Sequence, residues 1–583
     1  MTALRQWCVA HRPFVVALAL GAAVRVIASL AFSPGLVFSD GPLYLGFLHR
    51  FAAYPDHVAG YSMLLLYPLS LLTGRLVLAA TVAQHVLGLS TATLLYLMLR
   101  RWGVGRGLAT LATLPVLFDA MQLLLEQSVF SDTLFVLLLT IVMALLGWRR
   151  RPTPGLAVGA GLCLGAAVTV REVGEPLVVL TTAFCLIAGH GWRGRLLPAA
   201  ALLVGFAVPV TAYAAFYHHT YGVYALSQFD GKALWLRSTT FVDCSRLSVP
   251  HYERVLCPAQ ALGHRRDPTY YGWHDPQTLP RLHPPPGTTR DEAMGQFGAA
   301  AIRAQPLDYL RVGLRDFALN FDVARVDRFG YDTAYKWHFS HYVTGWAETR
   351  QQLRAYHRNG GQQLVAHEPW AYFLAGYSWV VYLPGPLLLG CLAVGLSAGL
   401  VRVCRDPWTR SMCLLLTLSG TVLLLVPGFT VEFVWRYQLP ALVLLPAGAA
   451  LAWSAIRRPP GAEGAAGNLT GRGPAADDLR AAPPGPPYGE SEDGRGRRRD
   501  ALRASARPPR RGRAGGALST SRSGGRPGRG CAPAPVRAGT SPRRCPGRLP
   551  RSPRRRSRPL AGAGPGAVPA VRGPRCPDGS RSR

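Results

Sequence analysis

Long apolar segments recur along the first 456 residues of the chain, and short polar connections separate them. Each is close to the length that crosses ~30 Å of hydrocarbon as a helix. We count about ten: Pro13–Phe32, Leu76–Leu99, Gly107–Leu125, Thr133–Trp148, Gly155–Val170, Val173–Ala188, Leu196–Tyr217, Ala371–Val401, Ser411–Pro427 and Phe433–Ile456. The pattern predicts an all-α, polytopic membrane protein with about ten transmembrane helices.

Clusters of arginine follow every second apolar segment. They are Arg100, Arg101 and Arg106; Arg149 to Arg151; Arg193 and Arg195; Arg402, Arg405 and Arg410; and Arg457 and Arg458. Because short cytoplasmic loops hold the excess of Lys and Arg, the clusters predict that both termini are cytoplasmic. The outer face then holds a first loop, residues 33–74, and a long polar segment that can form an extracytoplasmic lobe.

The predicted organisation has four parts. Residues 1–217 form an N-terminal transmembrane module with the first outer loop, and residues 218–370 form the extracytoplasmic segment. Residues 371–456 form the C-terminal transmembrane helices, and residues 457–583 form a cytoplasmic tail. Within the outer segment, residues 300–321 read as one amphipathic helix that returns towards the membrane.

The tail is a low-complexity sequence of Arg, Pro, Gly and Ala. It holds most of the net charge of +33 and has almost no large apolar residues, so we predict that it is disordered. Its arginines could bind anionic lipid headgroups or nucleic acid. The alternative is an extension without function, such as an out-of-frame reading of GC-rich DNA. Since no RNA-binding motif accompanies the arginines, we expect no nucleic-acid partner.

The overall composition excludes an ordinary soluble protein. The chain is 49% hydrophobic and only 16% charged, whereas a soluble chain of this length would carry charged surfaces on several domains. It has only two lysines, Lys232 and Lys336, as expected of a GC-rich bacterial genome. These features indicate a multi-pass protein of a bacterial plasma membrane.

Two of the 11 cysteines, Cys244 and Cys257, lie in the outer polar segment. An oxidising compartment makes a disulfide between them the expected state. Metal binding is the weaker explanation, because no second Cys or His pair follows at zinc spacing.

Three acidic residues fall near the outer ends of the predicted helices: Asp40, Glu126 and Asp132. Each has an ordinary explanation. Asp40 can cap the helix that Pro42 begins, and Ser131 or Asp132 can cap the next helix that starts on this face. Taken together, however, these acids come from separate parts of the sequence and map to the same membrane surface.

Two arginines, Arg171 and Arg436, lie on the outer face, where the positive-inside rule predicts few. Arg171 can extend its guanidinium to the interface, and Glu432 can neutralise Arg436. Combined with the acids, they also suit chemistry on a phosphorylated lipid. A carboxylate can act as general base towards a hydroxyl, and arginines can bind a departing phosphate.

At this point the chain resembles the GT-C superfamily of membrane glycosyltransferases that use a polyprenyl-phosphate carrier. It is similar to protein O-mannosyltransferases and aminoarabinose transferases over about Arg12–Arg458. The matching stretches are SDGPLY, HVAGYSMLLLYPLSLL, QHVLGLSTATLLYLMLRRWG, FDAMQLLLEQSVFSDTLFVLLL, VREVG, FVDCSRLSVPHYERVLCP and WRYQLP.

The resemblance implies roles for individual residues. Asp40 would be the catalytic carboxylate, and Asp132 and Glu126 would match further acidic positions. Three residues would contact the donor phosphate: Arg171, Arg436 and Tyr437. The first loop departs from the protein O-mannosyltransferases, which carry paired Asp and Glu where this chain has Asp40 and Gly41. Some relatives use a divalent metal, but no set of His and Asp ligands is evident here.

The sequence therefore predicts transfer of a sugar from a polyprenyl-phosphate donor to an acceptor hydroxyl, with inversion, at the outer membrane face. The acceptor would be a protein, a lipid or a polysaccharide. One alternative is a transporter or lipid flippase, for which Arg25, His85 and Asp119 are the ionisable candidates within helices. The other alternative is a non-catalytic membrane scaffold that displays the outer lobe.

Overall fold

The described residues of the computed structural model are 2–52, 54–328, 330, 334–342, 365–400 and 406–457. The predicted disordered tail lies outside these residues from position 458 onwards, as do Arg402 and Arg405 of the predicted cytoplasmic clusters. The described chain is helical, with two isolated bridges in place of a sheet, Leu36 with Ser128 and Tyr54 with His57.

The helices before the lobe are α1 (Thr2–Ala10), α2 (Arg12–Ala31), α3 (Gly41–Arg50), α4 (Tyr67–Leu72), α5 (Leu76–Arg101), α6 (Arg106–Phe118), α7 (Ala120–Glu126), α8 (Asp132–Leu146), α9 (Pro154–Val170), α10 (Leu177–Ala188) and α11 (Gly191–Tyr221). The later helices are α12 (Asp230–Ser238), α13 (Arg290–Ala304), α14 (Pro306–Leu319), α16 (Trp370–Val380), α17 (Gly385–Leu400), α18 (Pro407–Thr430) and α19 (Leu439–Ile456).

Within the described ranges, 5 helical segments are long and apolar enough to cross a membrane, or up to 7 if each of two bent pairs is one span. This property identifies a multi-pass membrane protein. All ten predicted segments fall on helices, but α8, α9 and α10 have 15, 17 and 12 residues, fewer than the ~20 that a straight span needs. The count of ten spans therefore stays a prediction.

Two predicted single spans are bent. The α6–α7 pair bends by 52° at Asp119, and the α16–α17 pair bends by 51°. The second bend contains Pro384 and Pro386, which cannot donate backbone hydrogen bonds to continue a helix. At the first bend, the Asp119 carboxylate accepts a hydrogen bond from the backbone of Met121 and so caps α7.

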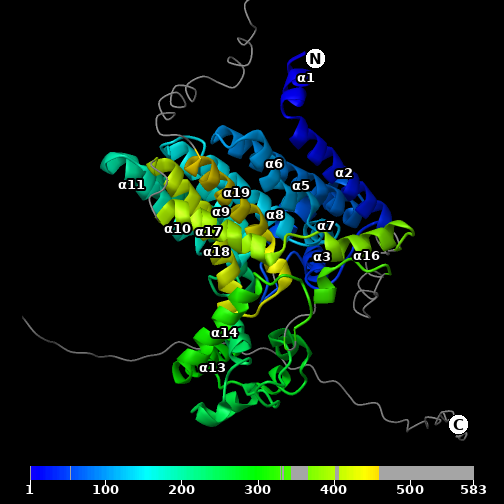
Figure 1. Cartoon of the computed structure of the whole chain (residues 1–583). Helices are drawn as coiled ribbons and strands as arrows, with labels where there is room; N and C mark the ends of the chain where they lie inside the picture. The colour runs from blue at the N-terminus through cyan, green and yellow to red at the C-terminus, as the bar shows by residue number, and fades with distance from the viewer. Residues whose placement is uncertain are drawn as a thin grey trace, which may run out of the picture. The chain divides into compact units, whose positions relative to one another are not determined.

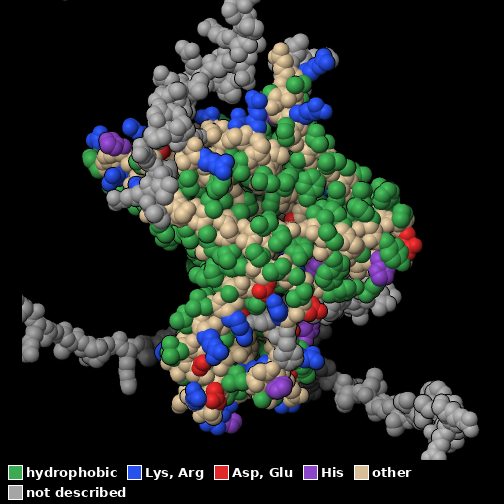
Figure 2. Space-filling model, viewed as in Figure 1, with side chains coloured by type: hydrophobic (Ala, Val, Ile, Leu, Met, Phe, Trp, Pro, Cys, Tyr) green, Lys and Arg blue, Asp and Glu red, His purple; other side chains and the backbone are tan. Residues whose placement is uncertain are grey.

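Small residues allow the closest helix packing in the bundle. Gly161 and Gly165 of α9 face the backbone of α11, and Gly205 of α11 faces the backbone of α9, so that a Cβ atom at any of these positions would collide. Such contacts matter in lipid because burial of apolar surface gives no net advantage there. Figure 2 shows apolar side chains over the visible side of the bundle and charged side chains mainly towards its ends.

The polar segment predicted to lie on the outer face forms a lobe with its own core, which includes Trp235, Tyr271 and Phe297. Cys244 and Cys257 are joined by a disulfide in this lobe. The single amphipathic helix predicted for residues 300–321 is instead two helices, α13 and α14, because Gln305 is non-helical before Pro306.

Helix α14 carries the lobe back to the bundle, where it packs on α18 (Figure 1). A buried ion pair anchors the contact: Arg237 Nη1 lies 2.6 Å from Asp316 Oδ2 and also donates to the carbonyl of Gly428 at 2.8 Å. The lobe is thereby held over one end of the helical bundle.

Candidate functional site

A cavity of about 950 Å³ lies where the lobe meets the ends of the helices. Its walls come from separate parts of the chain: the loop before α3, the start of α8, the turn between α9 and α10, α12 of the lobe, and the segment between α18 and α19. Five of the six predicted catalytic and phosphate-binding residues line it, namely Asp40, Asp132, Arg171, Arg436 and Tyr437.

Asp40 pairs with Arg436 across this cavity. Asp40 precedes α3, but its side chain makes no cap hydrogen bond, so the predicted ordinary explanation does not hold. Instead Arg436 Nη2 donates to Asp40 Oδ2 at 2.6 Å. Burial raises the pKa of Asp40, but the charges of Arg436 and His57 outweigh burial and hold it well below its usual range. Asp40 is therefore a carboxylate at neutral pH.

Asp132 pairs with Arg171, with Arg171 Nη1 at 2.8 Å from Asp132 Oδ2. The cap residue of α8, Ser131, makes no side-chain cap hydrogen bond. Its hydroxyl lies 2.9 Å from the Tyr44 hydroxyl and 3.4 Å from Arg171 Nη1. Asp132 thus lines the cavity, and Ser131 contacts two residues of its wall, Tyr44 and Arg171, instead of capping the helix.

Tyr437 connects the two ion pairs. The guanidinium carbons of Arg171 and Arg436 each lie 5.4 Å from the centre of its ring. Arg436 also lies over Phe130 and Trp337 and is only 6% exposed. Its Nε and Nη1 atoms are buried and have no hydrogen-bond partner among the described residues, a deficit that a bound anion would satisfy.

Backbone pairing aligns the loops that carry Asp40 and Asp132. The amide of Leu36 donates to the carbonyl of Gln127 at 2.8 Å, and the amide of Val129 donates to the carbonyl of Leu36 at 2.9 Å. This short bridge joins two loops that are about ninety residues apart in sequence, and it places both acids on one wall.

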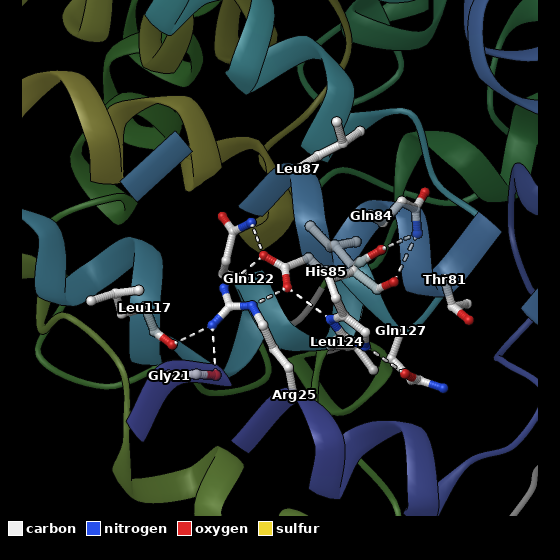
Figure 3. Close-up of polar contacts among 12 residues, drawn as sticks. Gly21, Arg25, Thr81, Gln84, His85, Leu87, Leu117, Gln122, Leu124 and Gln127 are labelled. Atoms are coloured by element: carbon white, nitrogen blue, oxygen red, sulfur yellow. Dashed lines mark hydrogen bonds and ion pairs between the residues drawn. The ribbon is translucent and has the colours of Figure 1, made fainter. Parts of the chain in front are cut away.

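Glu126 does not line the cavity, contrary to its predicted catalytic position. It is fully buried, and Arg25 contacts both of its oxygens at 2.7 and 2.8 Å (Figure 3). His85 Nδ1 lies 2.9 Å from Oε2, and Gln122 donates to Oε1 at 2.7 Å. A carboxylate that is saturated by partners inside the bundle acts as a structural anchor.

The prediction from sequence missed the other half of the cavity wall. Asp56, His57, Glu172 and Asp230 line it together with Trp273 of the lobe. Lys232 donates to Asp56 at 2.9 Å and lies 3.8 Å from the centre of the Trp273 ring. The sequence signal for these residues was their predicted position on the outer face. Many polar residues share that predicted position, so the signal does not single out these four.

Glu172 follows Arg171 directly and has an unusual charge state. Burial, with the nearby charges of Glu175 and Asp230, raises its pKa to about 7, although a hydrogen bond with Ser227 opposes the shift. Between about pH 4.5 and 7 the folded chain therefore keeps a proton that the unfolded chain releases. Stability should fall as pH rises through this window and then level off.

We predict that Glu172→Gln will flatten this dependence. The midpoint of thermal unfolding in detergent, measured at intervals from about pH 5 to 8, should fall less with pH in the variant than in the wild type. Glu292→Gln is the matched control: Glu292 is exposed, lies outside the cavity, and its capping role at α13 can be kept by Gln, so its substitution should leave the slope unchanged. Equal slopes for wild type and Glu172→Gln would show that Glu172 does not titrate in this range.

The described residues hold no group of three or more His, Cys, Asp and Glu side chains arranged for a metal ion. Two carboxylates of the cavity, Asp40 and Asp132, are paired with arginines. We assign no step to a metal ion.

No family model matches the sequence, and no curated protein matches it. Among solved structures, the chain is similar to the S. cerevisiae protein O-mannosyltransferase Pmt1-Pmt2 complex bound to the sugar donor, with 15% identity and a TM-score of 0.30. The match covers 44% of this chain and 38% of the yeast chain. At this identity and TM-score the likeness carries no weight for function, which must be inferred from the cavity.

Proposed function

We propose that this protein is a membrane glycosyltransferase that moves a sugar from a polyprenyl-phosphate donor to an acceptor hydroxyl at the outer face of the membrane. The observation that carries the proposal is the convergence of two carboxylate–arginine pairs, Asp40 with Arg436 and Asp132 with Arg171, on one cavity at the ends of apolar helices. A lipid-linked substrate would reach such a cavity from the bilayer beside it.

Arg436 is the proposed anchor of the donor phosphate. Its guanidinium is fixed against aromatic rings, and two of its nitrogens have no acceptor within the described chain. Arginine binds phosphate through two parallel N–H donors, Nη2 with either Nε or Nη1, so a phosphate would use one of these unpaired donors together with the Nη2 that Asp40 holds in the resting site. Arg171, whose guanidinium also lies 5.4 Å from the centre of the Tyr437 ring, would bind the same group.

Asp40 is the proposed base. While Arg436 holds Asp40, the carboxylate is ionised but tied to the guanidinium. A phosphate that takes over the guanidinium would free the carboxylate to accept the proton of the acceptor hydroxyl. The acceptor oxygen would attack the anomeric carbon as the bond to the phosphate oxygen breaks, so a single displacement inverts that carbon. The donor phosphate leaves with the electron pair of the broken bond.

A transport function receives less support from the same contacts. Arg25 and His85 both contact Glu126, and Asp119 forms two 3.0 Å hydrogen bonds with Arg325. These groups satisfy one another in two separate clusters, whereas transport would need ionisable groups along a path across the bilayer.

The direct test is the fate of lipid-linked sugars. A strain without the protein should accumulate one polyprenyl-phosphate sugar, detected by mass spectrometry, and the wild-type gene should remove it. Purified protein in liposomes should convert the same lipid to polyprenyl phosphate. If no such lipid accumulates, and the purified protein consumes none of a panel of polyprenyl-phosphate hexoses and pentoses, the proposed function is wrong.

Arg436→Lys should lower kcat about 100- to 1,000-fold, the usual cost of losing one well-placed donor to a developing anion. Lysine can keep the ion pair with Asp40, but it lacks the planar pair of donors. Arg50→Lys, on an exposed outer arginine away from the cavity, is the control and should retain activity. Equal turnover in Arg436→Lys and wild type would remove Arg436 from the phosphate site.

A further inference from the structure

A second cavity, of about 590 Å³, lies at the far ends of two helices: α18, which lines the first cavity, and α10, which begins next to it. Helix α10 begins beside Pro176 in the candidate active site and ends at the second cavity, and α18 runs between the same two places in the other direction. The positive-inside rule assigns this end to the cytoplasmic surface, because three of the predicted arginine clusters meet there.

The rim of this cavity is strongly basic. Four arginines line it, against one carboxylate: Arg150, Arg151, Arg195, Arg410 and Asp406. Figure 2 shows blue and purple side chains gathered at this end, where α11 begins.

The single acid is already engaged. Asp406 accepts hydrogen bonds from the backbone and hydroxyl of Thr409, as the cap of α18, and pairs with Arg150 at 3.1 Å. Among the described residues, neither Arg151 nor Arg410 forms a salt bridge. The rim therefore keeps an excess of positive charge that no described side chain neutralises.

The interior of the same cavity is apolar. Side chains of α10 and α18 form it: Leu180, Ala183, Phe184, Ile187, Leu414 and Leu418. Ile187 is 67% exposed, although it lies at the end of an apolar helix. A small soluble anion would need the rim alone, whereas a molecule with a charged head and hydrocarbon chains would contact both surfaces.

We propose that this cavity binds an anionic glycerophospholipid of the inner leaflet. The phosphate lies between Arg195 of α11 and Arg410 of α18, and an acyl chain lies along the apolar wall between α10 and α18. Basic pockets between transmembrane helices on the cytoplasmic side are suited to such headgroups. This inference concerns a different end of the protein from the proposed transfer reaction and does not depend on it.

Photo-crosslinking tests the site in the full chain. Phosphatidylglycerol with a diazirine in its acyl chain, in detergent–lipid micelles, should label peptides that contain residues 180–188 and 411–418, as mapped by mass spectrometry. The double variant Arg195→Ala/Arg410→Ala should need about 30-fold more lipid for equal labelling, since each arginine is removed from a phosphate contact. Arg193→Ala, in the same first turn of α11 but outside the cavity, should label like the wild type.

Two further variants distinguish the binding of a lipid from the binding of a free phosphate. Ala183→Phe fills the apolar wall, and Ile187→Gln makes an exposed part of it polar without added bulk. Both keep every arginine, including those of the tail, and both should weaken labelling of these peptides. The expected pattern also includes competition by unlabelled phosphatidylglycerol but not by phosphatidylcholine or glycerol phosphate.

Three results would overturn the proposal. A zwitterionic probe could label these peptides as strongly as the phosphatidylglycerol probe does, which would indicate an ordinary contact with annular lipid. It could be unchanged in Arg195→Ala/Arg410→Ala while that variant keeps its thermal midpoint. Glycerol phosphate could compete as well as the lipid, which would indicate a site for a soluble anion.

Discussion

Asp40→Asn should lower sugar transfer by about 100- to 10,000-fold, the usual contribution of a general base. Asparagine has nearly the same shape and can still accept a hydrogen bond from Arg436, so the protein should fold and insert normally. It cannot take a proton from the acceptor hydroxyl. The measurement is release of polyprenyl phosphate from the labelled donor by purified protein in liposomes.

Asp308→Asn is the matched control, because Asp308 lies in the first turn of α14 in the lobe and does not line the cavity. The control should transfer sugar at the wild-type rate. Both variants should elute from size exclusion as the wild type does. Normal transfer by Asp40→Asn would show that another group removes the proton, and inactivity accompanied by a lower thermal midpoint would indicate a folding defect.

Arg25→Met should destabilise the protein by about 3–5 kcal/mol, because it leaves the Glu126 carboxylate charged and buried without its main partner. The pair is enclosed: Arg25 is 2% exposed and Glu126 is 0% exposed. Arg25 also donates to the carbonyls of Gly21, Val116 and Leu117, and so joins α2 to α6. The apparent free energy of unfolding in detergent measures the loss.

The double variant Arg25→Met/Glu126→Leu shows how much of the lost stability comes from the unpaired charge and how much from altered packing. Replacing both partners of a buried ion pair is often close to neutral, so the double variant should recover much of the lost stability. Gly88→Ala gives an independent test, since its Cβ would collide with the Glu126 carboxylate. If Arg25→Met were as stable as the wild type, Glu126 would have to be protonated or solvated inside the bundle.

Much of the helical architecture could be predicted from the sequence. A segment of apolar residues must satisfy its own backbone hydrogen bonds in lipid, so its helical state follows from composition alone. All ten predicted segments fall on helices, and the polar segment between the seventh and eighth of them forms a lobe. The bends at Asp119 and before Gly385 were not predicted, because each depends on local backbone conformation and on partners far away in sequence.

The candidate site could be predicted only in part. Asp40, Asp132, Arg171 and Arg436 stood out because a charge near the outer end of an apolar helix is costly and needs a partner. The sequence could not say which acid meets which arginine. Glu126 satisfied the same criterion as Asp132, only six residues away, yet it turns into the bundle towards Arg25.

The hydrophobic pattern and the placement of charges were thus sufficient to predict that this chain forms membrane helices. They also predicted that acids and arginines lie at one end of these helices. Local composition is sufficient for this, because the bilayer acts on each segment separately. Only the tertiary structure decided that Asp40 pairs with Arg436, that two guanidinium groups lie near the Tyr437 ring, and that Glu126 is an internal anchor. Such pairings depend on packing between helices and loops up to about four hundred residues apart, which no local pattern records.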